Sequence, residues 1–224
     1  IEAADLVAFI KENSIDGILV RSATKVRKDL IDACPTLKFI GRGGVGMDNI
    51  DVEYGRDKGL AVFNTPAASS QSVAELVMGH LFSISRSLHH SNRAMPLEGT
   101  ENFKTLKKQY SKGSELRGKT LGIVGFGRIG RSLASYALGC GMKVVAHDRF
   151  AENGEVEVNV GDVSISVDCQ MLSMEEVLKQ SDAISLHIPA QANGQAVIGA
   201  EQLAMMKPGA ILLNAARGGV VDED

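Results

Sequence analysis

Three glycines, at positions 125, 127 and 130, separate a short apolar segment from a segment rich in alanine and leucine. In this GxGxxG pattern, Gly125 permits a tight turn, Gly127 lets the backbone approach a pyrophosphate, and Gly130 lets a helix lie close to the sheet. Arg128 and Ile129 begin that helix, so their N–H groups and its positive dipole end face the phosphates. A lone GxGxxG is weak, but the strand, the helix and a later acidic residue are all present. We therefore predict a dinucleotide site rather than a structural glycine turn in another α/β protein.

The acidic residue is Asp148, which closes the next apolar segment, Lys143-Val-Val-Ala-His147. A carboxylate at this position accepts hydrogen bonds from ribose hydroxyls and repels a 2′-phosphate. The pattern therefore predicts NAD rather than NADP as the cofactor, although the neighbouring Arg149 softens the repulsion.

Composition excludes several other classes of function. A net charge of −3 argues against a nucleic-acid partner, and no apolar stretch reaches the ~20 residues that span a bilayer. The three cysteines, Cys34, Cys140 and Cys169, lack metal-ligand spacing and cannot all pair. They fit a reducing compartment, so we predict a cytoplasmic protein with no metal site and no membrane partner.

The segments before the glycines alternate between helical and strand patterns. Helices are predicted over 5–12 and 26–33, and strands over 17–20, 37–40 and 61–63. This alternation implies a parallel sheet with right-handed crossovers. One long helix is predicted over 72–94, ended by Met95-Pro-Leu-Glu-Gly-Thr100. Its broad apolar face is typical of a helix that packs between domains or subunits.

A hairpin is predicted after Asp148, because 155–160 and 163–167 alternate apolar and polar residues around Gly161-Asp162. Helices over 174–179 and 198–206 and strands over 183–187 and 211–213 follow. Residues 220–224 resemble the start of a further helix.

With these residues, the chain resembles the D-isomer-specific 2-hydroxyacid dehydrogenases, and within them the enzymes that oxidise D-3-phosphoglycerate. Besides the glycine turn, matching stretches follow the family's order along almost the whole chain: Val20-Arg-Ser-Ala-Thr-Lys-Val26, Gly41-Arg-Gly-Gly-Val-Gly-Met-Asp-Asn-Ile-Asp51, Asn64-Thr-Pro66, Ala74-Glu75, Ser181-Asp182, Leu186-His-Ile-Pro189, Met206-Lys-Pro-Gly209 and Asn214-Ala-Ala-Arg-Gly-Gly-Val-Val-Asp222. The last stretch is the most specific to the family. The first is the most specific to the phosphoglycerate enzymes. The hairpin departs from the family's pattern.

The resemblance implies an α/β protein with two Rossmann-like, doubly wound parallel-sheet domains. Residues 1–68 would be an incomplete substrate-binding domain, and 69–224 an NAD-binding domain that lacks its C-terminal part. It implies a homodimer or homotetramer that oxidises D-3-phosphoglycerate to 3-phosphohydroxypyruvate in serine biosynthesis. Two alternatives stay open: a hydroxypyruvate or glyoxylate reductase of the same family, and a non-catalytic NAD-sensing protein like the corepressors built on this fold.

By resemblance, Arg217 is the catalytic arginine, which anchors the substrate carboxylate and polarises the keto oxygen. The alternative is an arginine that bridges sheet and loop. The family's catalytic glutamate and histidine lie downstream of Asp224, and none of the five histidines in this chain matches. We therefore expect the chain as written to bind dinucleotide without turnover.

The remaining site residues also come from the resemblance. Arg21 and Arg42 would bind the phosphoryl end of the substrate, with Thr24 as a hydroxyl donor; alternatively, either arginine pairs with Asp48 or Asp51 and only orders the loop. The loop from Gly43 through Gly44 and Val45 to Gly46 would bind the carboxylate with successive N–H groups. The nicotinamide side would be lined by Val45, Ile188, Pro189, Ala215, Ala216 and Arg217.

Overall fold

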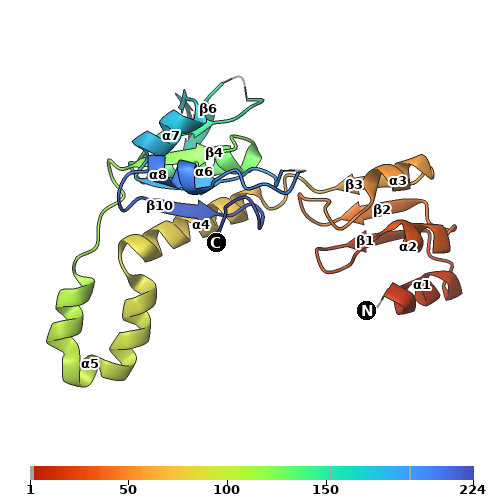
Figure 1. The fold of residues 1–224 in the computed structure, drawn as a ribbon, viewed down its shortest axis with the longest axis horizontal. Coiled ribbons are helices and arrows are strands. Elements are labelled where there is room, and N and C mark those ends of the chain that lie inside the picture. The colour runs from red at the N-terminus through yellow and green to blue at the C-terminus, as the bar shows by residue number, and fades with distance from the viewer. Residues whose placement is uncertain (1–2, 152, 192) are drawn as a thin grey trace. The chain divides into compact units, whose positions relative to one another are not determined.

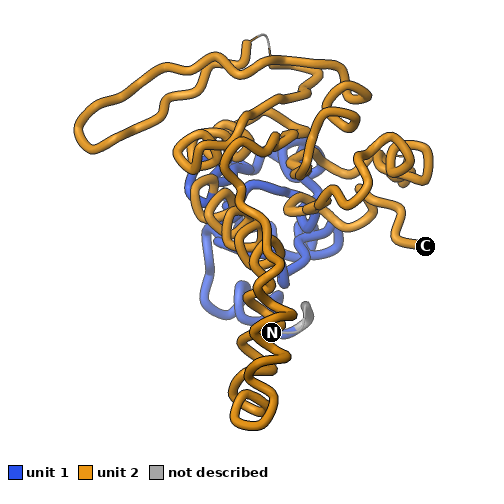
Figure 2. The backbone as a smooth tube through the Cα atoms, turned by 90° about the vertical axis from the view of Figure 1, so that its left-hand side faces the viewer, with its two compact units in different colours: residues 1–69 blue, residues 70–224 orange. Residues whose placement is uncertain are grey.

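The chain divides into two units, residues 1–69 and 70–224 (Figure 2). Each unit is built on its own parallel sheet. The structure is a computed structural model that describes residues 3–151, 153–191 and 193–224. None of the helices in this described part combines the length and apolar composition that a membrane-spanning helix requires.

The first unit has a sheet in the order β1-β2-β3, formed by Gly17–Val20, Phe39–Arg42 and Ala61–Asn64. Its helices are α1 (Ala3–Glu12), α2 (Lys28–Ala33) and α3 (Val52–Asp57). Strand β2 begins two residues later than predicted, because the Leu37 N–H bonds the Cys34 carbonyl in the turn that ends α2. Arg42 is therefore the last residue of β2, directly opposite Val20 and Asn64 in the register.

The second unit has a five-stranded parallel sheet in the order β10-β9-β4-β5-β8. The strands are β4 (Thr120–Val124), β5 (Lys143–His147), β8 (Gln170–Met171), β9 (Ala183–Leu186) and β10 (Ile211–Asn214). Ile123 points into the core beneath α4 (Ser70–Ser85) and α6 (Arg128–Gly139), whereas Val124 points into the core beneath α7 (Met174–Gln180). A short helix, α8 (Ala200–Met205), packs beside α7. Both faces of the sheet are thus covered, and the predicted doubly wound parallel architecture is confirmed (Figure 1).

The predicted long helix over 72–94 is wrong. Helix α4 ends at Ser85, and Ser87 adopts a left-handed conformation with φ 52° before α5 (Leu88–Tyr110) begins. Pro96 does not end this second helix; the non-helical residue inside it is Asn102, where the chain reverses. Helix α5 therefore consists of two legs that project from the sheet of the second unit (Figure 1).

The predicted hairpin is confirmed as β6 (Glu155–Val160) and β7 (Val163–Asp168), with Gly161 at φ 61° in the turn. The predicted helix at 220–224 is wrong. Val221 forms a bridge with Ile198, and the Val220 carbonyl accepts hydrogen bonds from the Val197 and Ile198 N–H groups. These bonds hold the segment extended against the hydrophobic core beneath α7.

Candidate dinucleotide site

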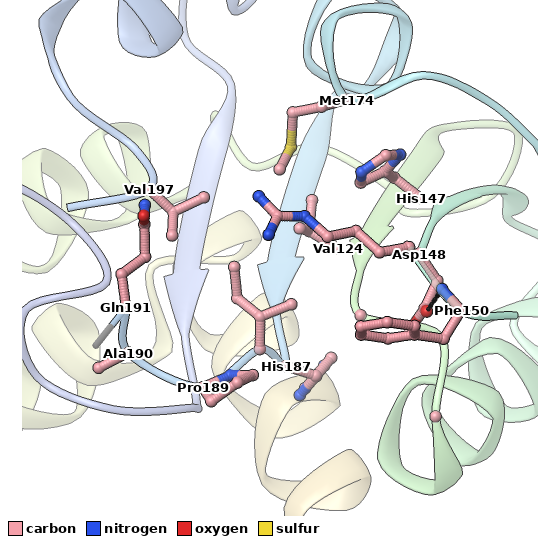
Figure 3. Close-up of a pocket in the computed structure, with 14 residues that line it drawn as sticks. Val124, His147, Asp148, Phe150, Met174, His187, Pro189, Ala190, Gln191 and Val197 are labelled. Carbon is pink, nitrogen blue, oxygen red and sulfur yellow. Dashed lines mark hydrogen bonds between the residues drawn. The ribbon is translucent and has the colours of Figure 1, made fainter. Parts of the chain in front are cut away.

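A cavity of about 300 Å³ opens at the carboxyl edge of the five-stranded sheet. It lies where β4 and β9 are neighbours and the chain's crossovers leave in opposite directions, which is the point where open α/β sheets bind their ligands. The lining residues lie at the ends of β4 and β5, in the segments that follow β4, β5 and β9, and at the start of α7. They are Val124, Gly125, Gly127, His147, Asp148, Arg149, Phe150, Met174, His187, Ile188, Pro189, Ala190, Gln191 and Val197. Figure 3 shows Gln191 and Val197 on the side opposite His147 and Phe150.

The three glycines meet different surroundings in the turn. Gly125 has φ 96°, and a Cβ there would lie 2.6 Å from the His187 carbonyl oxygen. A Cβ on Gly130 would overlap the Gly125 carbonyl oxygen. Gly127, by contrast, has an ordinary extended backbone and no protein atom within 4 Å of a built Cβ, although it lines the cavity. The first and third glycines are therefore required by the fold, and the second keeps the cavity open.

Asp148 connects the strand end to the glycine turn. Its carboxylate accepts hydrogen bonds from the N–H groups of Phe126 at 2.6 Å, Phe150 at 2.7 Å and Ala151 at 3.0 Å. Burial by itself raises the pKa of Asp148, but the backbone donors outweigh it, so the pKa is lowered overall. The carboxylate therefore stays ionised and fixes the turn beside the cavity.

These bonds make a contribution to stability that depends on pH. A carboxyl group with a lowered folded-state pKa stabilises the fold above its unfolded pKa of about 3.9, and this contribution is lost as the pH falls through the folded value. We expect the difference in unfolding free energy between wild type and Asp148→Asn to be constant near neutrality and to shrink below about pH 4. Urea unfolding across this range measures it, with Asp162→Asn in the hairpin turn as the control. A difference that persists unchanged below pH 3 would contradict the assignment.

Two histidines, His147 and His187, line the cavity. The His147 Nδ1 lies 2.9 Å from the Leu172 carbonyl, so this nitrogen carries the proton. The His187 Nε2 lies 2.9 Å from the buried Ser185 hydroxyl. Burial lowers the pKa of His187 to about 4, so its ring is neutral at physiological pH.

Several lining residues were not identified from the sequence. Phe150 is 90% exposed at the cavity, and its N–H is fixed by Asp148. Met174 and Val197 come from segments that follow β8 and β9. Phe150 could have been identified from the sequence, because it is an aromatic residue two positions after the acidic Asp148. No sequence pattern marks Met174 or Val197.

Ala215, Ala216 and Arg217 follow β10 at the same sheet edge, next to β9, but are not among the residues that line this cavity. Asn214 ties the turn: its side chain accepts from the Ala216 N–H at 3.1 Å and donates to the Arg217 carbonyl at 2.8 Å. The Arg217 guanidinium donates to the Ala216 carbonyl at 2.8 Å. The turn thus holds Arg217 at the carboxyl edge with an exposed side chain.

In the first unit, the predicted nest of successive N–H groups is only partly present. The Gly43 N–H donates to the Val20 carbonyl at 2.9 Å, and the Gly44 N–H donates to the Thr65 hydroxyl at 2.9 Å. The Val45 carbonyl accepts from Asn64 at 2.6 Å. The N–H groups of Gly43 and Gly44 therefore already have acceptors within the protein, and carboxylate binding by this loop stays a prediction.

Arg21 and Arg42 lie at the carboxyl ends of β1 and β2, as predicted, but differ in their surroundings. The Arg42 Nε donates to the Asn49 side chain at 3.0 Å, and its Nη2 donates to the Ser22 hydroxyl at 3.2 Å. Arg21 is exposed, and within the described part of the chain its guanidinium makes no hydrogen bond or ion pair. Arg42 therefore orders the loop, and Arg21 is the available cation.

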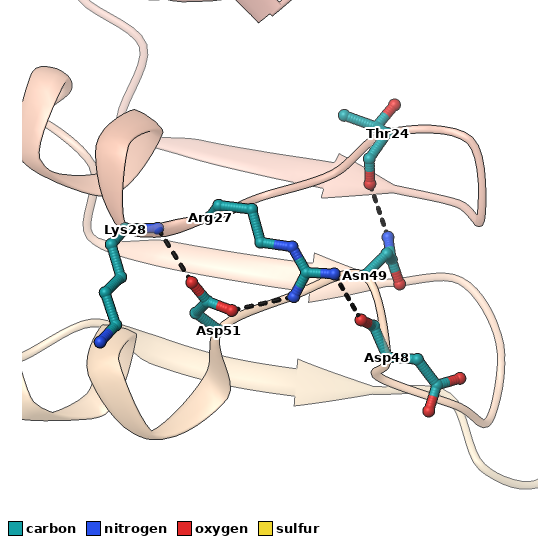
Figure 4. A network of polar contacts seen from close by, with 6 residues as sticks. All are labelled: Thr24, Arg27, Lys28, Asp48, Asn49 and Asp51. Atoms are coloured by element: carbon teal, nitrogen blue, oxygen red, sulfur yellow. Dashed lines mark hydrogen bonds and ion pairs between the residues drawn. The ribbon is translucent and has the colours of Figure 1, made fainter. Parts of the chain in front are cut away.

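Asn49 and Asp51 complete this loop through different partners (Figure 4). The buried Asn49 donates to the carbonyls of Arg21 at 2.9 Å and Thr24 at 2.6 Å, so Thr24 faces this network through its backbone. Asp51 binds Arg27 at 2.9 Å, and this side-chain hydrogen bond lowers the pKa of Asp51. The alternative that Arg21 or Arg42 pairs with Asp51 is therefore wrong.

Comparison with known proteins adds to this geometry. The family model described as "D-isomer specific 2-hydroxyacid dehydrogenase, NAD binding domain" matches residues 78–224. A hydroxypyruvate reductase of Thermotoga maritima is 41% identical over the whole chain, which covers 67% of that protein. A D-3-phosphoglycerate dehydrogenase of Methanocaldococcus jannaschii is 41% identical over 98% of the chain, which spans only 39% of that protein.

A solved structure shows the same fold over the whole chain. The NAD⁺-bound 3-phosphoglycerate dehydrogenase of Entamoeba histolytica superposes with a TM-score of 0.73 and 30% identity. The match covers 100% of this chain and 62% of that one.

Proposed function

Because the chain belongs to the D-isomer-specific 2-hydroxyacid dehydrogenase family, we propose that the protein transfers a hydride between NAD and a 2-hydroxy acid. The observation that carries the proposal is the cavity at the strand switch point, which is lined by the glycine turn and by Asp148, with Asp148 hydrogen-bonded to that turn. When bound, NAD supplies the hydride chemistry, and the protein supplies position and charge.

The roles of the second unit follow from its geometry. Gly127, where there is room, and the first-turn N–H groups of α6 at Arg128 and Ile129 would hold the pyrophosphate. Asp148 orients the adenosine ribose. Ile188 and Pro189 line the cavity beside the glycine turn, and Ala215 to Arg217 follow the neighbouring strand. Arg217 holds a carboxylate with its planar guanidinium and polarises the keto oxygen.

For the substrate, we propose D-3-phosphoglycerate, oxidised to 3-phosphohydroxypyruvate as in serine biosynthesis. The available Arg21 guanidinium at the β1 end supports a phosphorylated substrate. Such a substrate carries a second anionic group besides its carboxylate, and Arg21 would bind this phosphoryl group. Thr24, Gly44, Val45 and Gly46 share that edge and complete the proposed substrate side, together with Arg42, which shapes the loop.

A hydroxypyruvate or glyoxylate reductase is the second candidate. The hydrogen bonds from Arg42 to Asn49 and Ser22 favour this reductase. They leave only Arg21, of the two arginines, available to bind a phosphoryl group. The similarity to the Thermotoga maritima hydroxypyruvate reductase favours it as well. A non-catalytic NAD-sensing protein is a third reading, and measurable turnover by the full-length protein would exclude it.

We further propose a cytoplasmic homodimer or homotetramer. Helix α4 carries the apolar side chains Leu76, Phe82 and Ile84, which are 57%, 42% and 51% exposed on the surface of the second unit. Exposed apolar side chains on a helix of this kind are typical of a subunit interface.

The cofactor assignment has a direct test. NADH and NADPH titrations followed by nucleotide fluorescence should show tighter NADH binding, because Asp148 repels a 2′-phosphate. Asp148→Ser should narrow the ratio of the two dissociation constants by about tenfold, the size of one charged hydrogen bond. The ratio is used because loss of the turn's three hydrogen bonds weakens both nucleotides alike. Tighter binding of NADPH by the wild-type protein would overturn the assignment.

A further inference from the structure

Two asparagines of the chain, Asn153 and Asn193, directly precede a glycine. An asparagine in this position can lose its side-chain amide without an enzyme, because glycine has no side chain that hinders its own nitrogen. The glycine nitrogen attacks the asparagine Cγ, and the bond between Cγ and the side-chain nitrogen breaks. Ammonia leaves with the proton of the glycine N–H, and a cyclic succinimide remains. Water then opens the ring at either carbonyl, which gives aspartate or isoaspartate.

The fold holds Asn153 and its glycine in place. The Arg131 guanidinium donates to the Asn153 carbonyl at 3.0 Å and to the Asn153 side-chain oxygen at 3.2 Å. Gly154 is buried at the base of the hairpin, where its carbonyl accepts from the Cys169 N–H at 2.9 Å. A Cβ built on Gly154 would overlap the Cys169 carbonyl oxygen. The Gly154 nitrogen therefore cannot turn towards the Asn153 Cγ without breaking this packing.

Asn193 lies in an exposed turn that is much less restrained. Its side-chain oxygen accepts from the Gln195 N–H at 3.0 Å, which polarises the carbonyl that the glycine nitrogen must attack. Among the described residues, no atom lies within 4 Å of a Cβ built on Gly194, whose φ is 73°. The Gly194 N–H donates to the Gln191 carbonyl at 3.0 Å, and a hydrogen bond in an exposed turn opens at little cost. The Gly194 nitrogen can therefore reach the Asn193 Cγ.

This turn is connected to the dinucleotide cavity. Gln191, which accepts the Gly194 hydrogen bond, lines the cavity on the side opposite His147 and Phe150 (Figure 3). We propose that Asn193 is a site of spontaneous deamidation, and that the new carboxylate weakens the binding of an anionic dinucleotide.

The two products differ in their effect on the turn. Aspartate retains a side-chain oxygen that can accept from the Gln195 N–H, whereas isoaspartate adds a methylene to the main chain and changes the turn itself. Either product adds a negative charge two positions from Gln191. Like charges repel, so both products disfavour a ligand that carries a pyrophosphate. This effect on the cofactor rests on the proposed function, whereas the modification itself does not.

Peptide mass spectrometry of the folded protein during warm incubation at mildly basic pH tests the site. Cleavage after Arg149 and Lys179 places the two asparagines on different peptides. Asn193 should deamidate at least about tenfold faster than Asn153, because the reaction at Asn153 must first break the hydrogen bonds to Arg131 and Cys169. In the isolated peptides, which have no fold, the two rates should be comparable. Equal rates in the folded protein, or the same difference in the isolated peptides, would overturn the proposal.

NADH titration with matched variants tests the effect on the cofactor. After incubation, the wild-type protein and Asn153→Gln should bind NADH about two- to fivefold more weakly than before, the scale of an interaction between exposed charges. Asn193→Gln should keep its affinity, because it retains an amide and its longer side chain closes the ring poorly. Freshly prepared Asn193→Asp should already show the weaker binding.

Unchanged affinity of wild-type protein whose Asn193 has reacted would refute the effect on the cofactor. Failure of fresh wild-type protein to bind NADH would instead contradict the proposed function. The deamidation rates at Asn153 and Asn193 would then still decide whether Asn193 is the modification site.

Discussion

Replacing Gly127 with alanine is expected to weaken NADH binding about ten- to hundredfold while leaving the free energy of unfolding nearly unchanged. The built methyl group meets no protein atom within 4 Å, and the Gly127 backbone is extended in a way that any residue adopts. The methyl group would therefore occupy cavity space that the pyrophosphate needs. Losing a close hydrogen bond to a charged group costs roughly 1.5–3 kcal/mol, which gives this factor.

Gly130→Ala is the matched control, with the opposite pattern of effects. Its methyl group would overlap the Gly125 carbonyl oxygen and lie 3.1 Å from the Ile123 side chain. Overpacking of this kind costs about 1–3 kcal/mol of unfolding free energy. Urea unfolding and NADH fluorescence titration on both variants separate the roles. If Gly127→Ala destabilised the fold as much as Gly130→Ala, the second glycine would be structural and the pyrophosphate would have to lie elsewhere.

The parts of the fold that the sequence predicted are those set by local patterns. The glycine turn, its flanking strand and helix, and the hairpin at Gly161-Asp162 depend on short-range apolar periodicity and on positive φ at glycine. The prediction of one helix over 72–94 failed because the helix ends before Ser87, which adopts a left-handed conformation that no glycine or proline marks in the sequence. Pro96 misled the prediction because it lies inside α5 and does not end it.

Only those residues of the candidate site that belong to one continuous sequence motif could be predicted. Asp148 and the glycines were found because the motif fixes their spacing, but Met174 and Val197 join the cavity through the packing of distant segments. The loop at Gly43 to Gly46 shows the same limit. Its glycines suggested free N–H groups, whereas the Val20 carbonyl at the end of β1 and the Thr65 hydroxyl directly after β3 already accept two of them. Which donors remain for a ligand depends on tertiary hydrogen bonds that no local pattern shows.

The choice of substrate depends on Arg21. In the full-length enzyme, Arg21→Ala should reduce kcat/KM for 3-phosphohydroxypyruvate about ten- to hundredfold, the effect of losing one charged hydrogen bond to phosphate. Unphosphorylated hydroxypyruvate should be nearly unaffected, because Arg21 is exposed and supports no part of the loop through its side chain.

Arg42→Ala is the comparison that separates binding from loop order. Arg42 bonds Asn49 and Ser22, and Asn49 in turn holds the carbonyls of Arg21 and Thr24, so its loss should impair both substrates. In steady-state kinetics, the ratio of kcat/KM for 3-phosphohydroxypyruvate to kcat/KM for hydroxypyruvate should therefore fall in Arg21→Ala and stay nearly constant in Arg42→Ala. Equal losses on both substrates for Arg21→Ala would show that Arg21 is structural. The hydroxypyruvate reductase reading would then be preferred, because Arg21 would not distinguish a phosphorylated substrate from an unphosphorylated one.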